Sequence, residues 1–207
     1  MKVLIMVLSC QDSPFDEIRK GQMETWDSIH HPDVETIYYF GNGNNKMNGK
    51  NLSLNVSDRY YEMHWKFKLA LDYVWDMDWD YIFRTNTSTY VNKERLYNYI
   101  KKNTPDYSGN SNGSYLTGNA IILSRKSALI LKDNLVEVTK NQFPDEDIVI
   151  GDTLKASNIL PVHEELLSLY NFKLNTFEEG CCCYRCKGDN RPSDDIKAFK
   201  NILNKDQ

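Results

Sequence analysis

The chain has 207 residues and a mass of 24.2 kDa, which is typical of one domain rather than two. Its composition, 41% hydrophobic and 26% charged, excludes a disordered chain. A net charge of −4 argues against nucleic acid as a partner, and no apolar run approaches the ~20 residues that span a bilayer. We expect one globular domain over residues 1–207, either free-standing or part of a longer chain.

The chain begins with a run of six apolar residues, at positions 3–8. Six are too few for the core of a signal peptide, so the run predicts a buried first strand. Without a signal peptide, we expect a cytoplasmic protein whose five cysteines stay reduced.

Four of these cysteines lie close together as Cys181, Cys182, Cys183 and Cys186. Cys183 and Cys186 form a CxxC motif, but a second spaced pair is missing, so the spacing does not describe a zinc site. We favour free thiols. A disulfide, or a metal site completed by His163, stands as the alternative.

The rest of the chain alternates strand-like and helix-like segments. The expected strands are residues 34–40, 51–56, 81–83 and 121–123, with a strand or loop at 161–175. The expected helices are residues 15–30, 58–74, 92–101, 127–135, 144–156 and 196–203. This alternation predicts an α/β fold in which helices cover both faces of a mostly parallel central sheet.

Two of the helices carry an apolar stripe that predicts their buried face. In residues 58–74 the stripe consists of Tyr61, Trp65, Leu69 and Tyr73. In residues 15–30 it consists of Phe15, Ile18, Trp26 and Ile29, and Gln22 interrupts it.

Ligands of open parallel sheets bind beyond the carboxyl ends of the strands. The segments that follow expected strands, or lie beside them, are residues 9–13, 40–45, 86–88 and 117–119. No GxGxxG and no GxxxxGK[ST] motif occurs, so dinucleotide-binding and P-loop interpretations lose their main support.

Acidic residues gather at two places. Asp76, Asp78 and Asp80 precede the strand at 81–83, so we interpret them as turn and surface residues, with a shared divalent cation as the alternative. Asp145-Glu146-Asp147 predicts a helix start. The alternative is that one of these carboxylates acts as a general base, because the neighbouring like charges raise its pKa.

Six segments match, in chain order, the motifs of one enzyme group. They are residues 19–26 (RKGQMETW), 58–66 (DRYYEMHWK), 80–92 (DYIFRTNTSTYVN), 115–124 (YLTGNAIILS), 146–151 (EDIVIG) and 162–164 (VHE). Together they resemble the fringe and β-1,3-galactosyltransferase group of GT-A glycosyltransferases. The chain also resembles the glycosyltransferases that chlorella viruses encode for their capsid glycans, which would place it in the host cytoplasm.

The resemblance implies a GT-A (Rossmann-like) fold, a UDP-sugar donor such as UDP-glucose, a glycan or glycoprotein acceptor, and Mn²⁺ or Mg²⁺ as cofactor. It implies that Asp147 is the catalytic base. The implied donor-binding residues are Ser9, Cys10, Asp12, Arg19, Asn86, Thr117, Gly118 and Asn119. The implied metal ligands are Asn86, Ser88 and His163. Aromatic residues near strand ends are expected to stack on sugar or uracil: Tyr39, Phe40, Tyr90 and Tyr115.

The chain departs from this group at the acidic triplet that binds the metal, which here reads Asn86-Thr87-Ser88. A metal would lose up to three anionic ligands. We favour Mn²⁺ held by neutral ligands, His163, water and the diphosphate. The first alternative is substitution by Asp76 or Asp78. The second is a metal-free site in which basic residues neutralise the diphosphate: Arg185, Lys187 and Arg191.

The lost triplet also supports a different hypothesis, a degenerate module that binds a nucleotide or glycan without turnover. A redox or zinc protein built on the cysteine cluster is a third. The sequence leaves open whether an enzyme of this kind inverts or retains the anomeric centre.

Overall fold

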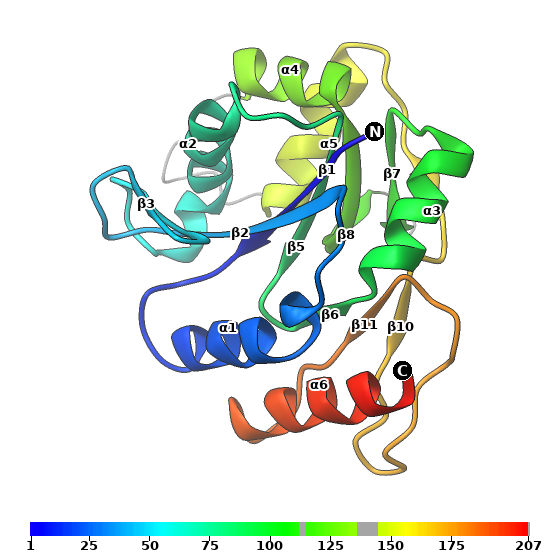
Figure 1. Ribbon diagram of the computed structural model, residues 1–207. Helices are drawn as coiled ribbons and strands as arrows, with labels where there is room; N and C mark the ends of the chain where they lie inside the picture. The colour runs from blue at the N-terminus through cyan, green and yellow to red at the C-terminus, as the bar shows by residue number, and fades with distance from the viewer. Residues whose placement is uncertain (112–114, 136–144, 207) are drawn as a thin grey trace.

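The computed structural model describes residues 1–111, 115–135 and 145–206. Within these residues the main sheet has eight strands in the order β3-β4-β2-β1-β5-β8-β7-β9, with helices on both faces (Figure 1). A smaller sheet has the order β10-β11-β6. The predicted α/β fold with a large, mostly parallel central sheet is therefore confirmed.

The strands are β1 (Val3–Leu8), β2 (Val34–Phe40), β3 (Lys46–Asn48), β4 (Asn51–Ser53), β5 (Tyr81–Asn86), β6 (Thr89–Val91), β7 (Tyr107–Ser111), β8 (Leu116–Ser124), β9 (Val162–His163), β10 (Leu167–Leu169) and β11 (Cys183–Arg185). The α-helices are α1 (Phe15–Glu24), α2 (Met63–Val74), α3 (Lys93–Asn103), α4 (Arg125–Asn134), α5 (Glu146–Ala156) and α6 (Ser193–Asp206). Short 3₁₀ helices cover Trp26–Ser28 and Tyr60–Glu62.

The central strand β1 runs parallel to β2 on one side and to β5 on the other. Leu8 lies in register with both Tyr39 and Asn86, so these three strands end at one edge of the sheet. Strand β8 is antiparallel to β5, which brings its first residues to the same edge. This edge is where the sequence places its candidate ligand site.

Alternation along β1 divides the molecule into two cores. Leu4, Met6 and Leu8 face α2, α4 and α5. Val3, Ile5 and Val7 face the layer that contains α1, α3 and α6. Strand β1 is buried along its whole length, as the apolar run predicts.

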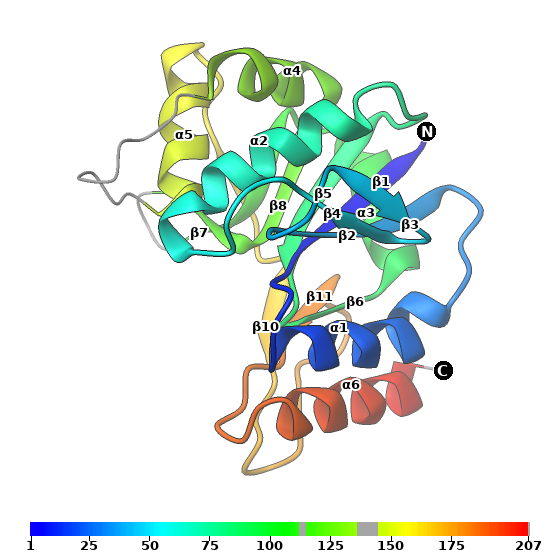
Figure 2. The same cartoon turned by 90° about the vertical axis from the view of Figure 1, so that its left-hand side faces the viewer.

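Helices α1 and α6 lie side by side below the sheet, although they come from opposite ends of the chain (Figures 1 and 2). Gly21 of α1 permits this approach, because a Cβ atom there would lie 2.6 Å from Cγ1 of Ile196. The C-terminal segment is thereby fixed against the layer that supports the candidate site. No helix among the described residues is both long and apolar enough to cross a membrane.

Several helix boundaries differ from the prediction. Helix α1 ends at Glu24, because Thr25 leaves the helical backbone and its hydroxyl donates to the carbonyl of Gly21 at 2.6 Å. The expected interruption, Gln22, is fully buried and donates to the carbonyl of Thr89 at 2.7 Å. Helix α2 starts at Met63 rather than at residue 58. Residue 144 of the helix expected at 144–156 lies outside the described residues.

The stripe predicted as the buried face of α2 was wrong. Tyr73 is 42% exposed, whereas the fully buried positions are Phe67, Ala70, Leu71 and Val74. A four-residue repeat advances by about 40° per step around a helix of 3.6 residues per turn, so the aromatic stripe drifts off the sheet. The spacing i, i+3, i+4, i+7 stays on one face.

Some strands were not predicted at all. Strands β3, β7 and β11 read KMN, YSGNS and CYR. They lack an apolar alternation long enough to be recognised, and β11 in addition pairs with β6, which lies far away in the sequence.

The two sides of α2 give a direct test of this packing. We expect Phe67→Ala to lower the free energy of unfolding by about 3–5 kcal/mol, because it leaves a cavity in the core. Tyr73→Ala, an aromatic truncation on the exposed side of the same helix, should cost less than about 1 kcal/mol. Urea unfolding measures both, and equal losses would contradict the assigned buried face.

Candidate functional site

Two adjoining cavities lie at the edge where β1 and β5 end. The first, which we call the Cys10 cavity, has a volume of about 410 Å³ and contains Ser9, Cys10, Asp58 and Lys66. The second, the Asp147 cavity, also has a volume of about 410 Å³. Its wall includes Thr117, Gly118, Asn119, Asp145 and Asp147. Residues common to both cavities are Leu8, Tyr60, Met63, Asn86, Arg185 and Lys187.

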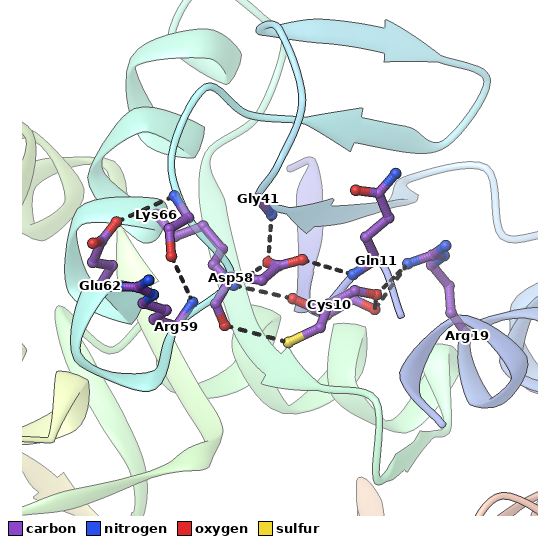
Figure 3. A network of polar contacts seen from close by, with 10 residues as sticks. Cys10, Gln11, Arg19, Gly41, Asp58, Arg59, Glu62 and Lys66 are labelled. Atoms are coloured by element: carbon purple, nitrogen blue, oxygen red, sulfur yellow. Dashed lines mark hydrogen bonds and ion pairs between the residues drawn. The ribbon is translucent and has the colours of Figure 1, made fainter. Parts of the chain in front are cut away.

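Asp58 joins the ends of two strands and a helix at the base of the Cys10 cavity (Figure 3). Its carboxylate accepts from the amide of Gln11, which follows β1, at 2.7 Å, and from the amide of Gly41, which follows β2, at 2.6 Å. It also forms an ion pair of 2.6 Å with Lys66 of α2, whose ammonium lies 3.3 Å from the carbonyl of Ser9. Each carboxylate oxygen therefore has a donor, and the loops that line the cavity are held together.

Asp58 and Lys66 belong to the family-like segment at residues 58–66, but neither was predicted as a site residue. The signal in the sequence that could have identified them is the spacing of the two residues within this segment. Lys66 is 1% exposed, and such a buried lysine requires a charged partner.

Arg19 supports the cavity from behind. Its guanidinium donates to the hydroxyl of Ser9 and to the carbonyl of Cys10, both at 3.0 Å, and stacks on the ring of Phe40. Of the residues predicted to border a uridine, Ser9 and Cys10 line the cavity and Arg19 positions them. Asp12 is exposed and lines neither cavity.

The turn that replaces the acidic triplet is organised by Asn86. Its side-chain oxygen accepts from the amide of Ser88 at 3.0 Å, from the hydroxyl of Ser88 at 3.1 Å, and from the hydroxyl of Thr89 at 3.4 Å. Its side-chain nitrogen donates to Asn119 at 2.6 Å. Both polar atoms of the Asn86 side chain therefore already have hydrogen-bond partners within the protein, and the side chain links β5 to β8.

The Asp147 cavity is built around a buried ion pair. Arg84 of β5 donates to both carboxylate oxygens of Glu146, and Nε lies 3.0 Å from Oε1. Arg84 also donates to the carbonyl of Gly118, where a Cβ atom would lie 2.5 Å from Nη1. Only glycine permits this approach. Burial raises the pKa of the Glu146 carboxyl, and the Arg84 guanidinium opposes that shift.

Asp147 is held by two backbone amides at the first turn of α5. The amide of Gly118 donates to Oδ2 at 3.1 Å, and the amide of Ile148 donates to Oδ1 at 3.1 Å. Thus three of the predicted residues, Thr117, Gly118 and Asn119, do lie beside the predicted base. The two amide donors fix the orientation of this carboxylate at the cavity wall.

A tyrosine connects the two cavities. The Tyr60 hydroxyl donates to Asp145, and this hydrogen bond raises the pKa of Tyr60 to about 12. The phenol therefore stays protonated near neutral pH. Burial raises the pKa of the Cys10 thiol, so this side chain is a neutral wall rather than a thiolate nucleophile.

The opposite wall comes from the C-terminal segment. Strand β11 pairs antiparallel with β6, which places Arg185 in register with Thr89. The amide of Cys186 donates to the carbonyl of Ser88 at 2.7 Å. Arg185 and Lys187 consequently line both cavities, and Arg191 lines the Cys10 cavity.

Of the three predicted metal ligands, Asn86 and Ser88 lie together, but His163 does not join them. His163 is exposed on the edge strand β9 and lines neither cavity. It lies three strands away from β5 in the sheet, or about 14 Å at normal strand spacing. Asp76 and Asp78 are exposed at the amino end of β5, about 20 Å along the strand from Asn86. Among the described residues, no group of three His, Cys, Asp or Glu side chains is placed to hold a metal.

The cysteine cluster is part of the core. Cys183 and Cys186 are fully buried and donate to the carbonyls of Leu166 and Tyr184, at 3.2 and 3.4 Å. Burial raises the pKa of both thiols, which opposes thiolate chemistry and metal binding. The redox and zinc hypotheses thus lose their support.

The expected stacking residues are also mostly structural. Tyr39 and Tyr90 are at most 1% exposed and belong to the two cores. Phe40 is covered by Arg19.

Comparison with known proteins places this fold. No protein-family model matches the sequence, and no curated protein matches it either. The structure is similar to that of a glycosyltransferase involved in the glycosylation of the major capsid of PBCV-1, with a TM-score of 0.61 and 14% identity over 97% of this chain and 99% of that one. It is also similar to the apo-form glycosyltransferase GlyE of Streptococcus pneumoniae TIGR4, with a TM-score of 0.56 and 8% identity over 99% of this chain and 63% of that one. The predicted glycosyltransferase fold is thereby confirmed.

The contacts of Asp58 predict that removal of its charge strongly destabilises the fold. Asp58→Asn should lower the free energy of unfolding by about 3–5 kcal/mol, because it leaves Lys66 buried without its counter-charge. Adding Lys66→Met should restore part of the loss. Asp72→Asn, which breaks a surface pair with Lys68, should cost less than about 1 kcal/mol. Urea unfolding compares the variants, and a loss for Asp58→Asn no larger than the Asp72→Asn loss would disprove the assigned role.

Proposed function

We propose that this protein is a glycosyltransferase that moves a sugar from a nucleoside-diphosphate sugar to a hydroxyl group of a glycan or glycoprotein. The observation that supports this most directly is the cavity pair, which joins a pocket at the end of β1 to a carboxylate held on α5. Both lie at the carboxyl edge of the central strands, where open α/β sheets bind ligands. The fold is that of known glycosyltransferases.

The Cys10 cavity is proposed to take the nucleoside. Its volume of about 410 Å³ falls within the range of small-molecule sites. Ser9, Cys10 and Asp58 line it, and Arg19 and Lys66 fix the loops that carry them. The resemblance of the segments at residues 19–26 and 58–66 to UDP-sugar enzymes supports uridine as the base and a hexose such as glucose as the sugar.

The Asp147 cavity is proposed to hold the sugar and the acceptor. The acceptor oxygen forms a bond to the anomeric carbon. The bond from that carbon to the β-phosphate oxygen breaks, and this oxygen leaves with the electron pair. The hydroxyl proton passes to the carboxylate of Asp147. A direct displacement of this kind inverts the anomeric carbon, and product stereochemistry tests it.

Asp147 is suited to this role by its support. Two amides hold the carboxylate in a single orientation, and α5 fixes the backbone, so little reorganisation is needed when the proton moves. The neighbouring carboxylate of Glu146 is engaged by Arg84 and cannot take the proton. This division of labour favours Asp147 over its neighbour as the base.

The alternative is a module that binds a nucleotide or glycan without turnover. The observation that favours it is the turn at Asn86, where the carboxylates of related enzymes are replaced by residues engaged with one another. Turnover distinguishes the two possibilities.

A ligand panel tests the nucleotide site. We expect UDP and UDP-glucose to raise the midpoint of thermal unfolding, and GDP, CDP and adenosine diphosphate to have a smaller effect. A ligand at about 100 times its Kd stabilises the folded state by about 2.7 kcal/mol, which a thermal-shift assay resolves. The uridine assignment fails if another nucleotide stabilises the protein more.

Replacement of the proposed base separates catalysis from binding. Asp147→Asn should reduce kcat by about 10²–10⁴-fold for sugar transfer or for hydrolysis of the donor. The donor Kd should change only a few-fold, because the nucleoside binds in the other cavity. Asp152→Asn, on an exposed position of the same helix, is the matched control and should keep its activity. Equal losses of binding and turnover would instead indicate a structural role.

A further inference from the structure

We infer that the diphosphate of the donor is held by Arg185 and Lys187, with help from Arg191, in place of a divalent cation. This inference rests on the proposed function, because it concerns how the same cavity binds a nucleoside diphosphate. Four observations support it: engaged oxygen ligands, an excess of positive charge, unpartnered guanidinium donors, and the pairing of β11 with β6.

The first observation is that the oxygen atoms nearest the expected metal position are already engaged. The side-chain oxygen of Asn86 accepts three hydrogen bonds, one of them from a backbone amide. The hydroxyl of Ser88 donates its hydrogen bond to Asn86, and Ser88 is only 7% exposed. A cation would have to break this turn to gain neutral ligands, which bind Mg²⁺ or Mn²⁺ weakly compared with carboxylates. The residues present do not fit the metal that the family resemblance implies.

The second observation is the charge of the Cys10 cavity. Four cationic side chains line it: Lys66, Arg185, Lys187 and Arg191. Lys66 is neutralised by Asp58, and Arg191 by Asp195 at 2.9 Å. Among the described residues, Arg185 and Lys187 form no ion pair. Two positive charges are therefore left over among the side chains that line this cavity, which matches the charge of a diphosphate.

The third observation is a set of unused donors. The guanidinium of Arg185, which is half-buried, makes no hydrogen bond within the described residues. Nη2 of Arg191 is buried and also lacks a partner there. A buried donor without an acceptor is costly, so its presence at a cavity wall points to a ligand that supplies acceptors. Burial lowers the pKa of Arg185, and repulsion from Arg191 adds to this shift. An anion between the two guanidinium groups would relieve the repulsion.

The fourth observation is how the fold brings the cations to this turn. Strand β11 extends the small sheet alongside β6, and the 2.7 Å hydrogen bond from Cys186 to Ser88 fixes the register. Arg185 then stands beside the residues that replace the acidic triplet. Carboxylates at positions 86 and 88 would share the cavity with Arg185 and take up its charge. The neutral triplet keeps the cations available.

These cations also suit the reaction. When the bond to the anomeric carbon breaks, negative charge develops on the β-phosphate oxygen. A guanidinium offers paired donors to such an oxygen, and these charged hydrogen bonds stabilise the developing charge. A divalent cation performs the same task in other phosphate chemistry.

The test measures UDP and inorganic pyrophosphate binding by isothermal titration calorimetry, in EDTA and in Mn²⁺. We expect both probes to bind in EDTA, and Mn²⁺ to change the Kd by less than about threefold. The variant Arg185→Gln/Lys187→Gln should bind about 10–100-fold more weakly, since hydrogen bonds between charged groups are lost. The control Lys197→Gln/Lys200→Gln removes the same charge from exposed positions of α6 and should bind like the wild type.

A substitution at one exposed position distinguishes a loss of binding from misfolding. Lys187 is exposed, so Lys187→Gln should fold normally and still weaken both probes more than Lys197→Gln does. Binding by the wild type that requires Mn²⁺, or unchanged binding by the double variant, would overturn the inference and leave the proposed function intact. Failure of UDP, GDP, CDP and pyrophosphate to bind under either condition would overturn the proposed function itself.

Discussion

The buried contact between Asp58 and Lys66 is the constraint on which the candidate site depends. One carboxylate holds the loop after β1 through Gln11, the loop after β2 through Gly41, and helix α2 through Lys66. Without the carboxylate, the edge of the sheet would lose its shape, and Lys66 would be a charge buried at a high energetic cost. The floor of the Cys10 cavity is thus an electrostatic structure more than an apolar one.

A second buried ion pair gives the other half of the cleft its form. Arg84 reaches from β5 to Glu146 on α5 and to the carbonyl of Gly118, so the central sheet, β8 and α5 meet at one guanidinium. This arrangement leaves Asp147 facing the cavity while its neighbour is neutralised. The cleft therefore combines the Asp147 carboxylate with Arg185 and Lys187, which form no ion pair within the part of the chain that the structure describes. In the proposed reaction, the cations would bind the diphosphate of the donor and the carboxylate would take the proton of the acceptor.

The sequence anticipated the position of some cavity-lining residues, although their roles stay predictions. Cys10 and Asn86 line the cavities as expected from the rule that parallel strands deliver their last residues to one edge, whereas Asp147 was expected as a base from the family resemblance. The prediction failed where the role depends on distant partners. Asn86 was expected to face a ribose or a metal, but Ser88 and Thr89 occupy its oxygen. His163 lies across three strands from the turn it was expected to complete. Hydropathy and motif spacing carry no information about either fact.

The sequence by itself determined the class of this protein. Alternating apolar strands and helices require an α/β sheet, and the long buried run at Val3–Leu8 requires a central strand, because burial of apolar surface does not depend on the details of packing. Only the tertiary structure decided the chemistry of the cleft. Strand β11 has too weak a pattern to be recognised, and its place beside β6 is set by backbone pairing over about 90 residues of chain. That pairing, not any local motif, brings Arg185 to the neutral turn at Asn86.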